Sequence, residues 1–296
     1  MKKFLQSQDS YTLHFATPKR FLTQKIISAK PKVIISLDLI DVKNLAKYNS
    51  QIKYLMYYID IFSKRVTIIT LKDKTKNSIL LGLKKFFSQE DNHKYSRIYS
   101  DLESGLYSNL VKQYLSKIKK KLYSNSSKER KNSIAERGIR SFKNKLYKYL
   151  THHKTFKFLD VIQDIVNSIN NSWHRSLKSK ELTPNILHQI TDKDYLKSQF
   201  HKMYDTNIYS RVNKTSSHLH KINDIVRIPK TEYTQNQFYK KFNVLNTEEL
   251  FRITDIKKNR YPYLYKLSDL SNEKIIGSFY SVELIPSALK KNILFK

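Results

Sequence analysis

The chain has 296 residues, of which 56 are Lys or Arg and 25 are Asp or Glu, giving a formal net charge of +31. This length allows two domains with a sizeable core, and so large a basic excess indicates a polyanionic partner such as nucleic acid. The absence of cysteine excludes disulfides, a catalytic thiol and every cysteine-containing zinc site. No apolar run approaches the ~18 residues that span a bilayer, and the start lacks the apolar segment of a signal peptide. We therefore expect a soluble, intracellular protein with no membrane partner.

The first 31 residues are polar and basic. Pro18 and Pro31 interrupt any regular pattern there. We expect residues 1–31 to form an extended basic N-terminal arm that leads into the first strand.

The stretch 32–190 mixes strand-like and helical runs. The first run, 33–42, is almost continuously apolar, which is typical of a central strand buried on both faces. Composition and periodicity then predict, in chain order, strands at 54–62 and 66–71, a helix at 75–87, a strand at 97–100, a helix at 106–118, a strand at 121–123, and helices at about 127–149 and 159–169. The stretch therefore reads as one α/β domain with a mixed five-stranded sheet.

Three carboxylates stand out in this domain. Asp38 lies in the middle of the first apolar strand, Asp101 follows the strand at 97–100, and Glu136 lies in a basic helical run, with 34 residues between the last two. Burying a lone carboxylate is costly, so Asp38 is either a paired structural acid or a metal ligand. Asp41, Asp60 and Glu103 are rivals; we expect Asp41 to face the other side of its strand.

The helix that contains Glu136 is strongly basic. Glu136, Arg140 and Lys143 fall on one face at i, i+4 and i+7, and the same helix supplies further DNA-binding candidates, Lys128, Lys131 and Arg137. The alternative is a solvated basic helix in which Glu136 pairs with Arg140. Together with Asp38 and Asp101, the pattern favours a metal ligand next to phosphate-binding cations.

The last part of the chain changes character. Residues 191–222 form a helical and basic linker, and short strand-like runs with polar turns follow within 223–288, ahead of a basic tail at 289–296. This pattern predicts a small all-β, SH3-like barrel. Such a barrel could bind protein, but its cations favour the DNA backbone: Arg227, Lys240, Lys241, Arg252, Lys257, Lys258 and Arg260.

Several motifs together resemble the retroviral-type integrases of Polinton/Maverick or virophage elements, a family with an Asp, Asp, Glu triad. The resemblance covers roughly residues 10 to 286 and rests on Asp38-Leu39-Ile40-Asp41, Ile59-Asp60-Ile61-Phe62-Ser63-Lys64, Ser133-Ile134-Ala135-Glu136-Arg137, Asn170-Asn171-Ser172-Trp173-His174-Arg175-Ser176, Thr183-Pro184 and Ile275-Ile276-Gly277-Ser278-Phe279-Tyr280. Gly138 replaces an aromatic residue of the family. The family's N-terminal His/Cys zinc module has no counterpart here, since His14 stands alone.

This resemblance implies a ribonuclease-H-like catalytic core followed by an SH3-like DNA-binding barrel. It implies two Mg²⁺ (or Mn²⁺) ions, with Asp38 bridging them, Asp101 completing one site and Glu136 the other; no zinc is expected. The implied activity is 3′-end processing and strand transfer into double-stranded DNA by a homo-oligomer, a dimer or tetramer, in the host nucleus or in a virion or viral factory. His174 is expected to be a structural hydrogen-bonding residue. A non-catalytic DNA-binding derivative and a ribonuclease-H-type nuclease are the alternatives.

Overall fold

The computed structural model describes residues 4–5, 8–18, 21, 23–24, 26–101, 103–124, 133–204, 220–230, 244–258 and 262–287. The chain divides into two compact units, a core unit of residues 26–206 and a terminal unit of residues 1–25 and 207–296. The predicted limits 32–190 and 223–288 lie inside these units. In the described part of the chain, no helix combines the length and apolar composition needed to cross a bilayer.

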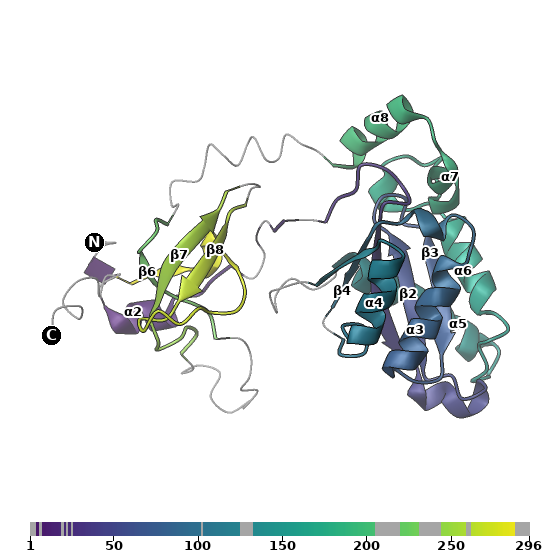
Figure 1. Cartoon of the computed structure of the whole chain (residues 1–296), viewed down its shortest axis with the longest axis horizontal. Coiled ribbons are helices and arrows are strands. Elements are labelled where there is room, and N and C mark those ends of the chain that lie inside the picture. Colours follow the sequence, from purple (N-terminus) through teal and green to yellow (C-terminus); the bar gives the residue numbers. More distant parts are fainter. Residues whose placement is uncertain are drawn as a thin grey trace. The chain divides into compact units, whose positions relative to one another are not determined.

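The core unit is built on a five-stranded mixed sheet in the order β3-β2-β1-β4-β5 (Figure 1). Its strands are β1 (Ile34–Asp41), β2 (Tyr54–Asp60), β3 (Val66–Leu71), β4 (Arg97–Ser100) and β5 (Lys121–Ser124). The pairs β1–β2 and β2–β3 are antiparallel, whereas β1–β4 and β4–β5 are parallel. The predicted mixed five-stranded sheet is therefore confirmed.

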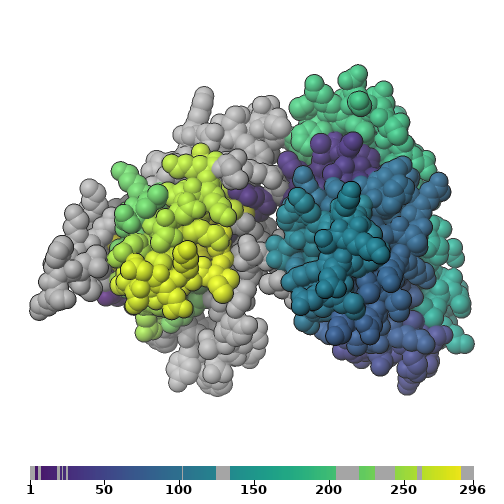
Figure 2. All heavy atoms as spheres, viewed as in Figure 1, coloured from purple at the N-terminus to yellow at the C-terminus, as the bar shows by residue number. Residues whose placement is uncertain are grey.

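Helices cover both faces of this sheet. The helices and 3₁₀ turns of the core unit are η1 (Lys43–Tyr48), α3 (Lys76–Phe87), η2 (Asn92–Lys94), α4 (Asn109–Lys117), α5 (Ser133–His152), α6 (Ile162–Asn170), η3 (Arg175–Leu177), α7 (Pro184–Gln189) and α8 (Lys193–Met203). Side chains of α3 and α4 close over one face (Figure 2) and pack on Met56, Tyr58 and Ile98. Helices α5 and α6 pack on the opposite face.

Local sequence explains where several helices begin. The Thr75 hydroxyl accepts a hydrogen bond from the backbone N–H of Ser78 and caps α3. The Thr183 hydroxyl accepts from the N–H of Ile186, with Pro184 in the first turn of α7, as the Thr-Pro pair predicts. The Asp192 carboxylate caps α8 in the same way.

The described strands of the terminal unit form a second five-stranded sheet in the order β10-β6-β7-β8-β9, in which every neighbouring pair is antiparallel. Its strands are β6 (Ile225–Arg227), β7 (Phe251–Lys257), β8 (Leu264–Ser268), β9 (Phe279–Tyr280) and β10 (Ile285–Pro286), with the turn η5 (Ser281–Glu283) between the last two. The predicted all-β character is confirmed. Closure into an SH3-like barrel stays a prediction.

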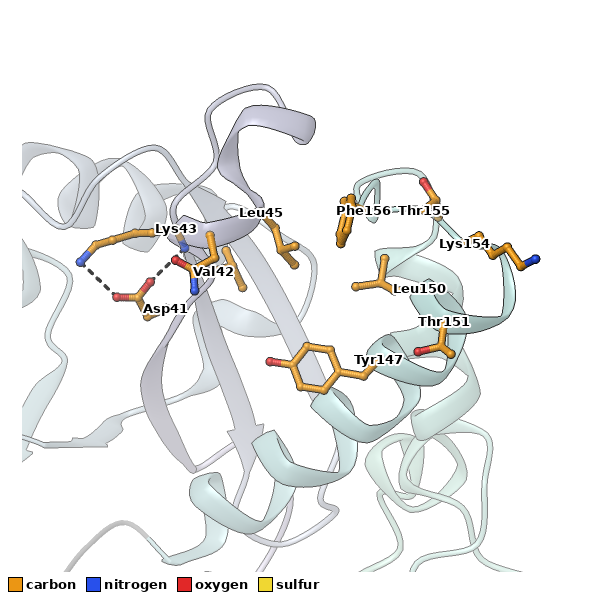
Figure 3. A pocket seen from close by; sticks show the side chains of 11 residues that line it. Asp41, Val42, Lys43, Leu45, Tyr147, Leu150, Thr151, Lys154, Thr155 and Phe156 are labelled. Atoms are coloured by element: carbon orange, nitrogen blue, oxygen red, sulfur yellow. Dashed lines mark hydrogen bonds and ion pairs between the residues drawn. The ribbon is translucent and has the colours of Figure 1, made fainter.

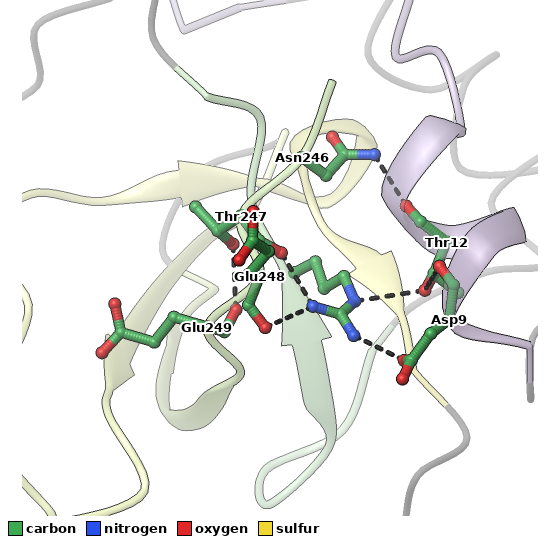
Figure 4. Close-up of polar contacts among 7 residues, drawn as sticks. Asp9, Thr12, Asn246, Thr247, Glu248 and Glu249 are labelled. Atoms are coloured by element: carbon green, nitrogen blue, oxygen red, sulfur yellow. Dashed lines mark hydrogen bonds and ion pairs between the residues drawn. The ribbon is translucent and has the colours of Figure 1, made fainter. Parts of the chain in front are cut away.

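The N-terminal arm differs from expectation because it contains helix α2 (Asp9–His14), which packs on the second sheet. The buried guanidinium of Arg227 donates to Asp9 Oδ1 at 2.6 Å and to Thr12 Oγ1 at 3.1 Å. Asn246 Nδ2 donates to the Thr12 carbonyl at 2.8 Å (Figure 4). No local pattern predicts this packing, because the partners of α2 lie more than 200 positions away in the chain.

Candidate active site

Two of the three predicted acids come from the neighbouring parallel strands β1 and β4: Asp38 lies within β1, and Asp101 directly follows β4. The β1–β4 ladder pairs Leu37 with Ser100, so the next step of the same register brings Asp38 opposite Asp101. Both carboxylates are half-buried. Residues 63 positions apart in the chain thus meet because β4 pairs in parallel with β1.

The environment of Asp38 disfavours its negative charge. Burial is the largest cause, and the charges of Asp101, Glu136 and Glu103 add to it, so that the pKa of Asp38 is raised to about 6. One hydrogen bond opposes this rise: the backbone N–H of Leu39 donates to Asp38 Oδ1 at 2.8 Å. A carboxylate held among three others in this way has the electrostatic setting of a cation-binding group.

Glu136 lies in the first turn of α5 and is half-buried. The helix is fixed on the sheet by fully buried Ala135, Phe142 and Leu146, which pack in the same cluster as Leu55. This packing orients the first turn so that the charge of Glu136 acts on Asp38 across the sheet face.

Gly138 allows α5 to approach the sheet closely. A Cβ atom at this position would lie 2.3 Å from the hydroxyl oxygen of Tyr57 on β2 and 3.0 Å from its Cζ. Tyr57 is fully buried, and its hydroxyl has no hydrogen-bond partner among the residues that the structure describes. The ring of Tyr57 therefore fills the space next to Gly138. Sequence reasoning missed Tyr57, although an unexpected glycine facing a tyrosine-rich strand was the available signal.

The three acids have no basic partner in the part of the chain that the structure describes. The ion pairs found there involve other carboxylates, including those of Asp41 with Lys43 at 3.1 Å and Glu103 with Lys74 at 3.6 Å. Among these same residues, no group of three His, Asp or Glu side chains is drawn together closely enough to enclose a metal ion. Asp38 and Asp101 are adjacent, and Glu136 is linked to them only by the effect of its charge on Asp38.

The donor set nevertheless fits a hard divalent cation. Mg²⁺ prefers carboxylate oxygens and retains several of its waters, so it does not need a closed protein cage. Burial first, and then the charges of the neighbouring acids, raise the pKa of Asp38, and a bound cation would offset both effects.

The rival acids have other roles. Asp60 is fully buried and accepts from the backbone N–H groups of Lys32, Phe62 and Ser63 at 2.7 to 2.8 Å, which makes it a structural acid of the β2–β3 turn. Asp41 is exposed and paired with Lys43.

The histidine of the Trp173-His174-Arg175 motif is structural, as expected. His174 Nδ1 accepts from the backbone N–H of Ser176 at 3.2 Å. Burial, with Lys64 and Arg137 nearby, lowers the pKa of His174 to about 4, so the ring is neutral near pH 7.

The predicted DNA-binding cations fall into three groups. Arg137 and Arg140 are exposed and Lys143 is half-buried on α5; on β7 and just after it, Arg252 is half-buried while Lys257 and Lys258 are exposed. Five others lie outside the described residues: Lys128, Lys131, Lys240, Lys241 and Arg260.

Arg227 is the exception. Its side chain is only 3% exposed and is saturated by Asp9, Thr12 and the carbonyls of Thr247 and Glu248. A guanidinium held in this way cannot reach a DNA phosphate, so Arg227 is not a DNA contact in this structure. It fastens α2 to the second sheet instead.

Comparison with known proteins adds two findings, while no protein-family model matches the chain. The putative uncharacterized transposon-derived protein F54H12.3 of Caenorhabditis elegans is 37% identical over 134 residues, which cover 45% of this chain and 46% of that protein. The chain thus matches less than half the length of this curated relative.

Among solved structures, the chain is similar to one in the cryo-EM structure of the simian T-cell lymphotropic virus intasome in complex with PP2A regulatory subunit B56 gamma. The TM-score is 0.65 at 13% identity, and the match covers 98% of this chain and 91% of the other. The HTLV-2 integrase catalytic core domain in complex with magnesium aligns with 54% of this chain at 19% identity and a TM-score of 0.44. The intasome match shows that the chain shares the fold of a protein chain in that assembly.

Proposed function

We propose that this protein is a DNA integrase that trims 3′ ends and joins them to a second DNA duplex with the help of divalent metal ions. One observation carries the proposal: Asp38 lies in β1 beside Asp101, which directly follows the parallel strand β4, and the charge of Glu136 acts on Asp38. The three carboxylates remain without a basic partner among the described residues of a chain whose net charge is +31.

Asp38, Asp101 and Glu136 would hold Mg²⁺ or Mn²⁺, two ions in the full site. When bound, such ions neutralise charge on the entering and leaving oxygens of phosphoryl transfer. The protein's own contribution is to place Asp38 in a rigid sheet, Asp101 at the end of a neighbouring strand and Glu136 on a helix packed against that sheet. None of them needs to form a covalent bond to DNA.

The cations would hold the DNA by its phosphates. On α5, Arg140 and Lys143 share the face of Glu136, so a bound strand that reaches the carboxylates also meets both side chains. On the second sheet, Arg252, Lys257 and Lys258 would bind backbone in the same way. Such contacts give affinity with little sequence readout and a strong dependence on salt.

The biological setting is inferred from the relatives. The Caenorhabditis elegans relative is named transposon-derived, and we propose that this chain serves a mobile element or virus of the Polinton/Maverick kind, in the host nucleus or a viral factory. Joining two DNA ends needs more than one active site, so we propose a dimer or tetramer. We keep 1–31, 32–190, 191–222 and 223–288 as the proposed arm, core, linker and barrel.

A strand-transfer assay tests the function. It combines the full chain, Mg²⁺ or Mn²⁺, a labelled element-end duplex and a plasmid target, and compares the wild type with Glu136→Gln. Asp164→Asn is a matched control, since Asp164 is an exposed acid on α6. Joined product from the wild type and Asp164→Asn, but not from Glu136→Gln, is the expected result.

The other outcomes identify the alternatives. Cleaved DNA without joined product would indicate a ribonuclease-H-type nuclease. Tight DNA binding without cleavage or joining in either metal would refute the enzyme and leave a DNA-binding derivative of an integrase.

A further inference from the structure

We infer that a pocket at the C-terminal end of α5 receives a single unpaired nucleotide of a DNA strand; this inference rests on the proposed function. The pocket, here called the α5 pocket, lies between residues 41–45, which end β1 and begin η1, and residues 147–156 of α5 and the turn after it (Figure 3). Its volume is about 680 Å³, which falls in the range of pockets that hold small organic ligands.

The floor of the α5 pocket is apolar and its sides are aromatic. Val42, Leu45 and Leu150 line it, and the rings of Tyr147 and Phe156 stand 51% and 55% exposed at its edge. Large aromatic side chains are usually buried or partnered. Two exposed rings around one hollow therefore provide stacking surfaces for a flat ligand.

One of these rings is held in place before any ligand binds. Phe156 stacks on Tyr48 with ring centroids 4.9 Å apart, and Lys47 lies 4.8 Å from the centre of the Tyr48 ring. Buried Asn49 donates to the Phe156 carbonyl and accepts from the N–H of Phe158, at 2.8 and 2.7 Å. The aromatic wall is thus preorganised, which lowers the entropic cost of binding.

The rim of the α5 pocket is cationic and rich in hydrogen-bonding groups. Lys43 and Lys154 both line the pocket and are exposed, with Thr151 and Thr155 between them. Asp41 pairs with Lys43, while no carboxylate in the described part of the chain pairs with Lys154. An apolar slot with aromatic sides is complementary to a base. The side chains of Lys43 and Lys154 extend away from the hollow on either side of it (Figure 3), where they can meet the phosphate that such a base carries.

The α5 helix connects this pocket to the proposed active site. Glu136, Arg140, Lys143 and Tyr147 follow one another at intervals of four, three and four residues and therefore share one face of the helix. At ~1.5 Å per residue, Tyr147 lies about 16 Å along the axis from Glu136. A DNA strand leaving the carboxylates would pass two cations and then reach the aromatic pocket. This path favours an unpaired nucleotide at the end of a strand over a free nucleotide or an acidic peptide.

Fluorescence anisotropy with the full chain in EDTA tests the inference. The probes are a blunt 20-base-pair duplex and the same duplex with a three-nucleotide 5′ single-stranded thymidine tail. We expect the wild type to prefer the tailed duplex by about tenfold, in the range of one stacked base. Tyr147→Ala and Phe156→Ala should abolish this preference and leave the affinity for the blunt duplex unchanged. Tyr195→Ala is the matched control, because Tyr195 on α8 is 42% exposed and lies outside the pocket.

A second readout places the base. With 2-aminopurine in the tail, binding to the wild type should quench its fluorescence, and binding to Tyr147→Ala should quench it less. The inference is overturned if Tyr147→Ala weakens both duplexes equally, if the tail gives no preference, or if thymidine monophosphate or an acidic aromatic peptide competes as well as the tailed strand. A tail preference that depends on Tyr147, in a protein that joins no DNA, would support the pocket and refute the proposed function.

Discussion

Replacing Asp38 by Asn should stabilise the metal-free protein. The fold raises the pKa of Asp38 from 3.8 to about 6, mainly by burial. Each unit corresponds to about 1.4 kcal/mol, so the ionised carboxylate lowers the free energy of unfolding by about 2–3 kcal/mol. Asn keeps an oxygen that can accept the 2.8 Å hydrogen bond from the N–H of Leu39 and carries no charge.

The sign of the pH dependence follows from the raised pKa. Between about pH 4 and pH 6, the folded protein holds a proton on Asp38 that the unfolded chain has already released. The stability of the wild type therefore falls as the pH rises through this window and stays low above it. The gain from Asp38→Asn should be near zero at pH 4 and reach its full value above pH 6.

Urea unfolding of the full chain in EDTA, at pH 4.5 and pH 7.5, measures this gain. The fluorescence of Trp173, the single tryptophan of the chain, reports on the core unit. Adding Mg²⁺ at pH 7.5 should stabilise the wild type and narrow its difference from Asp38→Asn, because the cation neutralises the carboxylate. Asp41→Asn should show no such gain, since its pKa is lowered, chiefly by the backbone N–H of Lys43.

Three results would refute this reasoning. Asp38→Asn could be no more stable than the wild type at pH 7.5. Its gain could be the same at both pH values, which would point to packing instead of charge. Asp41→Asn could give an equal gain, which would mean that reducing the acid count alone produces the effect.

Three further predictions follow from packing and ionisation elsewhere. Gly138→Ala should destabilise the core by about 2 kcal/mol, because its Cβ would meet the Tyr57 hydroxyl. Tyr57→Phe should stabilise the core by about 1 kcal/mol. If urea unfolding of the two single variants and the double variant gave purely additive changes, the contact would be contradicted. Arg227→Ala should lower the free energy of unfolding by about 3 kcal/mol and speed amide hydrogen exchange in α2. It should leave the salt dependence of DNA binding unchanged, whereas Arg252→Ala should make that dependence less steep. Burial lowers the pKa of His188 to about 3, so stability should fall as the pH drops below 6.5, and His188→Asn should remove that part of the slope.

Sequence alone predicted most of the core because its signals are local. The runs that became β3 and β4 have the composition of strands, and Thr183-Pro184 sets the start of α7. These features depend on periodicity and turn chemistry, which a chain displays within short windows. That Asp38 and Asp101 belong to one site came from the family resemblance and not from a local signal.

The features that sequence missed depend on contacts between distant segments. Helix α2 is six residues long and would be marginal alone; Arg227 holds it in place from the far end of the chain. The fit of Gly138 against Tyr57 joins a helix to a strand 81 positions earlier. Counting Arg227 among surface cations failed for the same reason, because only the folded structure shows which of 56 basic side chains is buried.

Asp38, which we propose binds a cation, and Asp60, which is a structural acid, lie in the same sheet. Burial raises the pKa of both carboxyls, so a raised pKa does not separate them. Their hydrogen bonds do: Asp60 accepts from three backbone N–H groups and lies beside Lys64, whereas Asp38 has one such bond and three acidic neighbours. Asp60→Asn should therefore destabilise the fold by about 1–3 kcal/mol, since an amide nitrogen would replace an oxygen that accepts from the backbone. If urea unfolding gave Asp60→Asn and Asp38→Asn changes of the same sign at pH 7.5, the assignment of Asp38 as the acid kept for a cation would lose its main support.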